Sequence, residues 1–291
     1  MIKLSKIYDQ YFNLKYTNEH LMGNNKTYQK FVLLTYRRTG ANYFHDLLRS
    51  HKAIVAYAAM YEQGRIGFIY PGYPSPYNKC LLKYRNNYPI DFLNHRIFGN
   101  YSHNIKAVGF KIVYETAHPV VFEYLSKQTD VKFIHLQRRN ILRLYLSDMI
   151  ASKLNIWGAV ARENENLFKN NKAESFTKVI EKNEDKVLPD DFTIKLDYED
   201  CLKVFIKIKG FVEKYNNYFK PGQVVNLYYE DLLINPDKEL EKIQKFLGVD
   251  YQKLTSRFIK INNQKLYDVI ENYSDLKKRF TGTEWAVFFE D

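Results

Sequence analysis

The chain has 291 residues, which is enough to bury a sizeable core as one large domain or at most two. Hydrophobic residues make up 45% and charged residues 26%, and no apolar run is long enough for a signal peptide or a membrane span. Lysine and arginine outnumber aspartate and glutamate by 44 to 33, so the net charge of +11 favours anionic partners: nucleotides, nucleic acid, membrane surfaces or acidic glycans.

The two cysteines, Cys80 and Cys201, lie far apart and have no metal-ligand spacing. This arrangement argues against both a disulfide framework and a cysteine-based metal site. We therefore expect reduced thiols and a cytoplasmic location.

Residues 1–30 show no clear periodicity, and we expect them to form an N-terminal arm that packs on the core. Residues 31–36 are a β-prone run, and apolar residues recur at helical spacing from Phe44 to Leu48. The basic turn 37–40 lies between them. The sequence thus predicts a strand, a tight loop and a helix.

Such a loop suits a phosphate or a sulfate-like group, because the N-terminus of the following helix has free N–H groups and a partial positive charge. Gly40 is expected where the chain reverses, and Arg37 and Arg38 stand beside it. The loop lacks the spacing and the Gly-Lys pair of the nucleoside-triphosphate loop G-x-x-x-x-G-K-[ST]. A basic turn on the surface is the less favoured interpretation of this loop.

The rest of the chain alternates strands and helices. Strands are expected at 53–56, 106–113, 131–136, 192–196 and 223–229, and helices at 119–128, 141–154, 197–219 and 236–246. An irregular loop is expected at 61–80 and a helix–loop excursion at 155–190. This alternation predicts an α/β fold with a mostly parallel sheet flanked by helices, and we expect a single domain over 1–291. Ligands of such folds bind at the carboxyl ends of the strands.

A second basic segment follows the strand at 131–136. Arg139 lies in the loop, and Ser147 comes eight residues later, about two turns into the next helix. An arginine and a hydroxyl in these positions would hold one phosphate together. Alone, the segment is more typical of a solvated basic helix start, whereas two anion sites at one sheet edge suit a nucleotide with phosphates at both ends.

Together the two segments resemble the sulfotransferases that use 3′-phosphoadenosine-5′-phosphosulfate (PAPS). Residues 38–40 match the 5′-phosphosulfate loop, Arg139 and Ser147 match the 3′-phosphate pair, and residues 228–248 resemble the family's YEDL turn and FLG helix end. The resemblance implies a P-loop-kinase-like sulfotransferase fold. It also implies a donor site formed by Arg37, Arg38, Thr39, Gly40, Ala41, Asn42, Tyr43, Arg139 and Ser147. Ala41 and Asn42 depart from the family, which often has Ser or Thr there.

The branch that this chain resembles most is the bacterial carbohydrate and nodulation-factor one, and this branch implies that Glu62 is the catalytic base. His118 and His51 are alternative bases. Arg38 would stabilise the bridging oxygen, and Lys111 would touch the transferring group or the acceptor.

The predicted function is transfer of a sulfuryl group from PAPS to a hydroxyl of a carbohydrate or glycolipid, without a metal and without a nucleic-acid partner. The excursions at 61–80 and 155–190 are expected on the acceptor side, where Tyr70, Tyr73 and Tyr77 would enclose a sugar, phenol or lipid. Two alternatives stay open: a kinase-like phosphotransferase, and a non-catalytic binder of nucleic acid or acidic glycan.

Overall fold

The structure is a computed structural model that describes residues 23–67, 77–161, 177–180, 188–189, 191–258 and 264–290. Most of the predicted N-terminal arm therefore lies outside the described residues. The same is true of Tyr70 and Tyr73 and of much of the two predicted excursions.

Five strands form the main sheet and two form a small separate one. The strands are β1 (Gln29–Thr35), β2 (Ile54–Ala59), β3 (Ala107–Val113), β4 (Val131–Gln137), β5 (Gly158–Ala161), β6 (Thr177–Ile180) and β7 (Val224–Tyr228). The helices are α2 (Ala41–Arg49), α3 (Lys79–Asn87), α4 (Pro89–Phe92), α5 (Pro119–Lys127), α6 (Ile141–Leu154), α7 (Tyr198–Asn216), α8 (Tyr229–Ile234), α9 (Pro236–Leu247), α10 (Leu266–Val269) and α11 (Tyr273–Phe280), with short turns at Leu93–Ile97, Tyr114–Thr116 and Ala286–Phe289.

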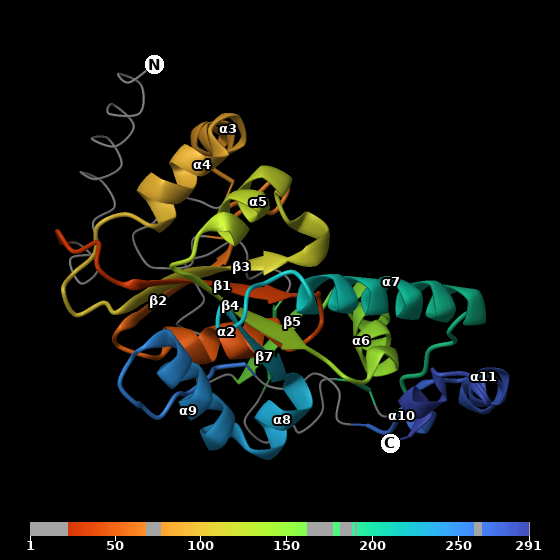
Figure 1. The fold of residues 1–291 in the computed structure, drawn as a ribbon. Coiled ribbons are helices and arrows are strands. Elements are labelled where there is room, and N and C mark those ends of the chain that lie inside the picture. The colour runs from red at the N-terminus through yellow and green to blue at the C-terminus, as the bar shows by residue number, and fades with distance from the viewer. Residues whose placement is uncertain are drawn as a thin grey trace.

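The main sheet has the strand order β2-β3-β1-β4-β7, and every pair in it is parallel. The first strand therefore lies in the centre, and the loops that follow all five strands come out at the same edge (Figure 1). This confirms the predicted α/β fold, and it places the basic loop after β1 in the middle of the carboxyl edge.

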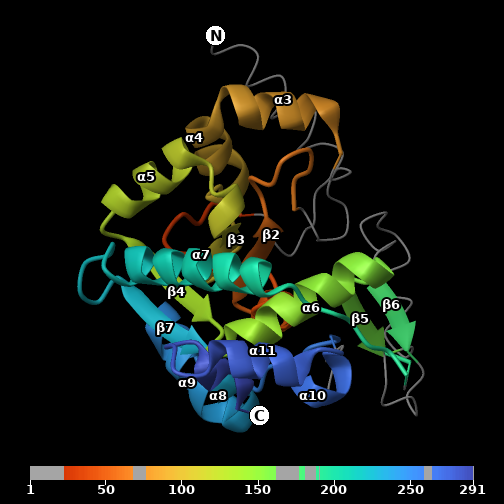
Figure 2. The same cartoon turned by 90° about the vertical axis from the view of Figure 1, so that its right-hand side faces the viewer.

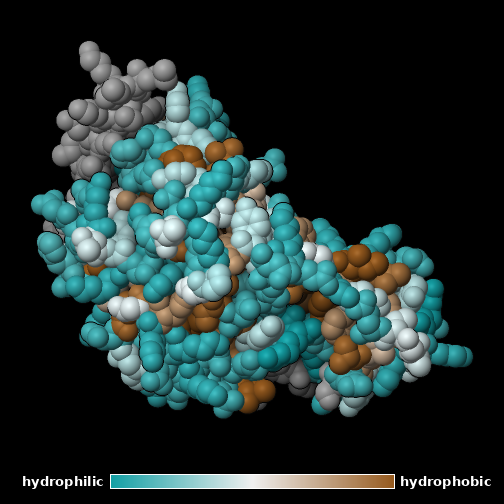
Figure 3. Space-filling view, in the orientation of Figure 1, coloured by the Kyte–Doolittle hydropathy of each residue, from teal (hydrophilic) through white to brown (hydrophobic). Residues whose placement is uncertain are grey.

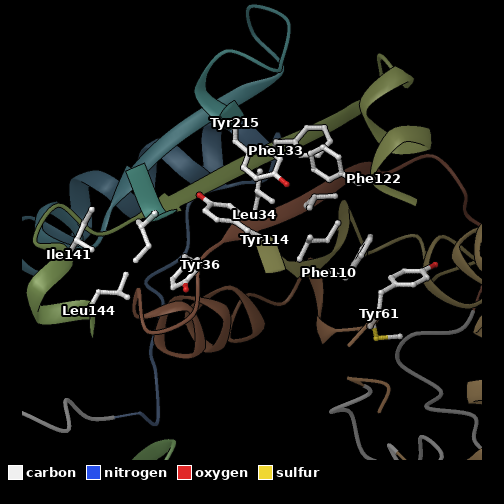
Figure 4. Close-up of a cluster of buried hydrophobic side chains, with 14 of the residues drawn as sticks. Leu34, Tyr36, Tyr61, Phe110, Tyr114, Phe122, Phe133, Ile141, Leu144 and Tyr215 are labelled. Atoms are coloured by element: carbon white, nitrogen blue, oxygen red, sulfur yellow. The ribbon is translucent and has the colours of Figure 1, made fainter. Parts of the chain in front are cut away.

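Helices cover both faces of the sheet because successive side chains of a strand point to opposite faces. From β1, Val32 and Leu34 join a large cluster with the apolar faces of α5, α6 and α7 (Figure 4). Phe31 and Leu33 face the opposite layer, which α2 and α9 complete. Both faces of the central strand are buried, and its near-continuous apolar sequence reflects this.

The predicted helices agree with the observed ones to within three residues at each end, and 141–154 is observed without change as α6. Figure 2 shows α6 beside α7, with β5 and β6 beyond the C-terminal end of α6. The strands β5 and β6 correct the prediction of a helix–loop excursion over 155–190.

The predicted strand at 192–196 is wrong. Only one isolated bridge forms there, between Ile194 and Ile270. The side chain of Asn272 bonds both the backbone N–H of Leu196, at 3.0 Å, and its carbonyl, at 2.9 Å. An amide side chain thus satisfies the backbone groups that a neighbouring strand would otherwise satisfy.

Cys80 is exposed and Cys201 is buried, and both are free thiols, as the spacing predicted. Figure 3 shows one face of the molecule, which is mainly hydrophilic with small scattered apolar patches. None of the helices in the described ranges is long and apolar enough to cross a membrane.

Candidate functional site

The loop between β1 and α2 has two residues in left-handed conformations. Arg38 has a φ of 64°, and Gly40, which immediately precedes α2, has a φ of 81°. A methyl group on Gly40 would lie 2.3 Å from the ring of Tyr229. Both the backbone conformation and the nearby ring therefore require glycine. The turn allows the free N–H groups at the start of α2 to face the carboxyl edge.

Thr39 fixes the loop from inside. Its side chain is buried, and its hydroxyl donates to the carbonyl of Tyr36 at 2.9 Å and lies 2.5 Å from the hydroxyl of Thr35. Thr35 in turn donates to the carbonyl of Leu136, at the end of β4. The hydroxyl of Thr39 therefore holds the loop against two central strands.

The guanidinium of Arg38 crosses from this loop to α6. Its Nε donates to the hydroxyl of Ser147 at 3.1 Å, and one terminal nitrogen donates to the carbonyl of Trp157 at 2.8 Å. Burial lowers the pKa of Arg38. The structure thus brings together two of the predicted donor-site residues, Arg38 and Ser147.

Arg37 points to a pair of carboxylates. Its Nε lies 3.5 Å from Glu115 and 3.3 Å from Asp148. Burial raises the pKa of Asp148, while the charges of Arg37 and Arg38 act in the opposite direction. The positive charge of Arg37 is therefore partly neutralised by carboxylates of its own chain.

Arg139 is paired with a carboxylate of α8. Its two terminal nitrogens bond the two carboxylate oxygens of Asp231 at 2.5 and 2.8 Å, and its guanidinium lies 4.1 Å from the centre of the Tyr228 ring. The hydroxyl of Ser147 accepts from Arg38 instead. The assignment of Arg139 to a phosphate stays a prediction.

Arg138 supports the loop, although no sequence motif assigns it a role. One of its terminal nitrogens donates to the carbonyl of Arg38 at 3.2 Å, and its guanidinium lies 5.1 Å from the centre of the Tyr229 ring. The only signal in the sequence was its position beside Arg139, and that position does not tell which of two neighbouring arginines points inward.

Lys111 of β3 forms a hydrogen bond with Asn42, on the other side of the loop after β1. The ammonium donates to the side-chain oxygen of Asn42 at 2.8 Å, and desolvation lowers the pKa of Lys111 to about 8. Ala41 is buried, and Tyr43 packs against the layer that contains α2. Asn42 therefore links the β1 loop to Lys111, and this contact lies where the family often has a hydroxyl.

Glu62 follows β2 and lies in a turn close to Lys111. Its Oε2 accepts a bond from Arg65 Nε at 2.5 Å, and the charges of both Glu62 and Arg65 act on the pKa of Lys111. Arg85 holds the backbone of this turn with bonds to the carbonyls of Met60, Glu62 and Arg65. The predicted base is thus placed in a braced turn at the edge that contains Lys111.

The two histidines proposed as alternative bases lie in different environments. His118 comes just before α5 and packs against the ring of Tyr61, with 5.8 Å between the ring centres, and burial lowers its pKa. His51 precedes β2, and its ring nitrogens bond the carbonyl of Asp250 and the N–H of Ala53. His118 therefore belongs to the carboxyl edge, whereas His51 has a structural role at the opposite end of β2.

The site therefore has two groups of side chains that meet at the β1 loop. One contains Arg38 and Ser147, and the other contains Lys111 and Glu62. The first group has hydroxyl and N–H donors for an anion, and the second joins a cation to a carboxylate. Within the described residues, no group of three or more His, Cys, Asp or Glu side chains is arranged to hold a metal ion.

Comparison with known proteins identifies the family. A family model described as a sulfotransferase domain matches residues 28–289. The chain is also 25% identical to nodulation protein H of Rhizobium tropici over 100 residues. That alignment covers 34% of this chain and only 40% of the relative.

The chain is also similar, at low sequence identity, to solved structures. A sulfotransferase from Alicyclobacillus acidocaldarius is 12% identical with a TM-score of 0.45, and the alignment covers 90% of this chain and 92% of that one. A mouse sulfotransferase complexed with PAP is 14% identical with a TM-score of 0.40, covering 79% of this chain and 61% of that one. Because the family model spans nearly the whole chain, the protein belongs to the sulfotransferase domain family.

Proposed function

We propose that the chain transfers a sulfuryl group from PAPS to a hydroxyl group of a carbohydrate or glycolipid. The observation that carries this proposal is the meeting of two chemically different groups at the β1 loop: Arg38 with Ser147 on one side, and Lys111 with Glu62 on the other. Membership of the sulfotransferase domain family supports the same reaction.

The donor would bind at the first group. The N–H groups at the start of α2 and the guanidinium of Arg38 suit the 5′-phosphosulfate, because they offer hydrogen bonds and positive charge in a loop shaped by Gly40. Ser147 and Arg139 would hold the 3′-phosphate. To do so, Arg38 would leave Ser147, and Arg139 would exchange the carboxylate of Asp231 for the phosphate.

The acceptor would bind at the second group. Glu62 would take the proton of the acceptor hydroxyl as its oxygen forms the new bond to sulfur, and the bond from sulfur to the phosphate oxygen would break. Lys111 and Arg38 would offset the charge that develops on the phosphate. The products are the sulfate ester, 3′,5′-diphosphoadenosine (PAP) and protonated Glu62.

The carbohydrate or glycolipid acceptor rests on the resemblance of the motifs to the bacterial nodulation-factor branch. Trp157, beside Arg38, and Tyr77 are exposed aromatic side chains from the two predicted acceptor-side excursions, and such rings suit stacking on sugars. The single-domain organisation and the cytoplasmic location stay predictions.

The direct test is incubation of the protein with labelled PAPS and a panel of glycans and glycolipids, with EDTA present. We expect label to appear in at least one acceptor, in amounts that EDTA does not reduce. A phosphotransferase would instead need a nucleoside triphosphate and a divalent metal. If no acceptor is labelled and PAP does not raise the melting temperature, the proposal is wrong.

A further inference from the structure

The carboxylate proposed as the base is held by an arginine of the same turn. Oε2 of Glu62 lies 2.5 Å from Nε of Arg65, and the two side chains are 33% and 41% exposed. Both are therefore within reach of a bound molecule. The pair lies beside Lys111, on the side of the β1 loop away from Ser147.

The side chain of Arg65 is not what holds this turn. Arg85 does so, because one of its terminal nitrogens donates to the carbonyls of Met60, Glu62 and Arg65 at 3.0, 2.9 and 2.6 Å. The side chain of Arg85 is buried, whereas that of Arg65 reaches the surface. Arg65 can therefore change its partner without loss of the turn.

Proton transfer in the proposed reaction would weaken the pair of Glu62 and Arg65. One oxygen of the carboxylate that would take the acceptor's proton accepts a bond from Arg65, so protonation removes the negative charge with which Arg65 is paired. After proton transfer Glu62 is neutral, and the guanidinium of Arg65 then lies beside the ammonium of Lys111 with no carboxylate between them. A second anion beside Arg65 would replace the lost carboxylate charge and offset the repulsion between the two cations.

We propose that the acceptor carries a carboxylate close to the hydroxyl that is sulfated, and that this carboxylate binds Arg65. A carboxylate is favoured because Arg65 already holds one, and the guanidinium bonds this shape well. The acceptor class is then a glycan or glycolipid that contains a uronic acid. This inference rests on the proposed sulfuryl transfer and names the acceptor of the same site.

The test compares two compounds that differ only in the charged group. Octyl β-D-glucuronide and octyl β-D-glucoside are titrated into the protein saturated with PAP, and binding is measured by calorimetry. We expect the glucuronide to bind up to about fivefold more tightly, because an ion pair at an exposed position is worth about that much. Arg65→Gln should reduce this preference to nearly one, and Arg65→Lys should restore part of it.

The matched control is Lys83→Gln, which removes one positive charge from the exposed side of α3. It should keep the full preference. The inference is overturned if neither compound binds, if both bind equally, or if Arg65→Gln behaves like Lys83→Gln, since Arg65 is then only a surface partner of Glu62. If PAP itself does not bind, the proposed sulfuryl transfer fails as well, so the two failures are distinguishable.

Discussion

At the scale of single residues, the site depends on a few side chains that have more than one partner available. Arg38 holds Ser147 and the carbonyl of Trp157, Arg139 holds Asp231, and Arg65 holds Glu62. Each of these cations is thus paired within the chain. A bound anion would have to replace the partner that the cation already has. The net binding free energy of the anion is therefore the difference between its own interaction with the cation and that of the replaced partner.

Glu62 is the residue whose replacement tests the chemical step most clearly. Glu62→Gln keeps the size and the hydrogen-bonding shape of the side chain but removes the base, so turnover should fall by about 10²–10⁴-fold. Binding of PAP should be unchanged, because Glu62 lies on the acceptor side. Steady-state kinetics and calorimetry measure the two effects.

The control for this variant is Glu123→Gln, which removes an exposed carboxylate of α5 that pairs with Lys127. Its turnover should equal that of the unchanged protein. Full activity in Glu62→Gln would show that another group accepts the proton, and His118 would then be the next residue to replace.

Gly40 tests the shape of the donor loop. Gly40→Ala places a methyl group 2.3 Å from the ring of Tyr229 at a φ of 81°, so we expect the free energy of unfolding to fall. The expected loss is about 1–3 kcal/mol, and PAP should bind more weakly because the loop moves. Urea denaturation and calorimetry measure these changes.

Gly222→Ala separates the effect of backbone strain from the effect of the contact with the Tyr229 ring. Gly222 has a φ of 80°, but nothing lies within 4 Å of an added methyl group, so this variant reports the backbone strain alone. It should be less destabilised than Gly40→Ala and should bind PAP normally. Equal losses in the two variants would contradict a packing role for the Tyr229 ring.

At the scale of the elements, the sequence predicted the strand–loop–helix units well because each one has a local signal. The apolar run of β1, the basic turn and the spacing of Phe44 and Leu48 are all contained within about twenty residues. The strand at 192–196 failed because its backbone partner is the side chain of Asn272, far along the chain. No local pattern encodes such a contact.

Contacts between distant elements also decide the partners of the side chains in the site. Arg139 and Ser147 are predicted to hold one phosphate together, and in the structure Arg139 is paired with Asp231 of α8. The hydroxyl of Ser147 accepts a hydrogen bond from Arg38, which lies in the loop after β1. Spacing along the chain predicts which residues lie near one another. Charged side chains of other elements then decide which of these residues form hydrogen bonds or ion pairs.

Arg139, in the loop before α6, is paired with Asp231 of α8, and this contact can be tested by removing the carboxylate. If Arg139 binds the 3′-phosphate, then Asp231→Asn should free it and tighten the binding of PAP. The effect should be at most about fivefold, because exposed ion pairs are worth up to about 1 kcal/mol. Calorimetry with PAP measures the change.

Asp237→Asn is the control for this prediction, because it removes a carboxylate from the first turn of the neighbouring α9 and should leave the affinity unchanged. Weaker binding of PAP in Asp231→Asn would mean that Asp231 positions Arg139 for the ligand instead of competing with it.

At the scale of the whole molecule, buried polar side chains make the fold sensitive to acid. Burial lowers the pKa of His45 to about 3 and that of His135 to about 4. Both are therefore neutral in the folded chain, where His45 bonds the carbonyl of Ala56 and His135 accepts from Gln137 and contacts the hydroxyl of Tyr114.

Below the ordinary histidine pKa of about 6.5, the unfolded chain binds protons at these positions and the folded chain does not. The stability that these residues contribute is thus complete above pH 6.5, and it is lost as the pH falls toward 4 for His135 and toward 3 for His45. The loss should reach about 2 kcal/mol per histidine at pH 5.

Urea denaturation at pH 7 and pH 5 measures this loss. His135→Gln should reduce the difference between the two free energies of unfolding, whereas the control His103→Gln, at an exposed position, should not. An unchanged difference in His135→Gln would assign the acid sensitivity to other groups.

The central claim is that the loop at the centre of the sheet binds a nucleotide with phosphates at both ends. The most direct measurement is calorimetric titration of the protein with PAP and with 5′-AMP, in EDTA. The account predicts that PAP binds at least about tenfold more tightly than 5′-AMP, because the 3′-phosphate adds charge-assisted hydrogen bonds. Equal affinities, or no binding of PAP, would contradict it.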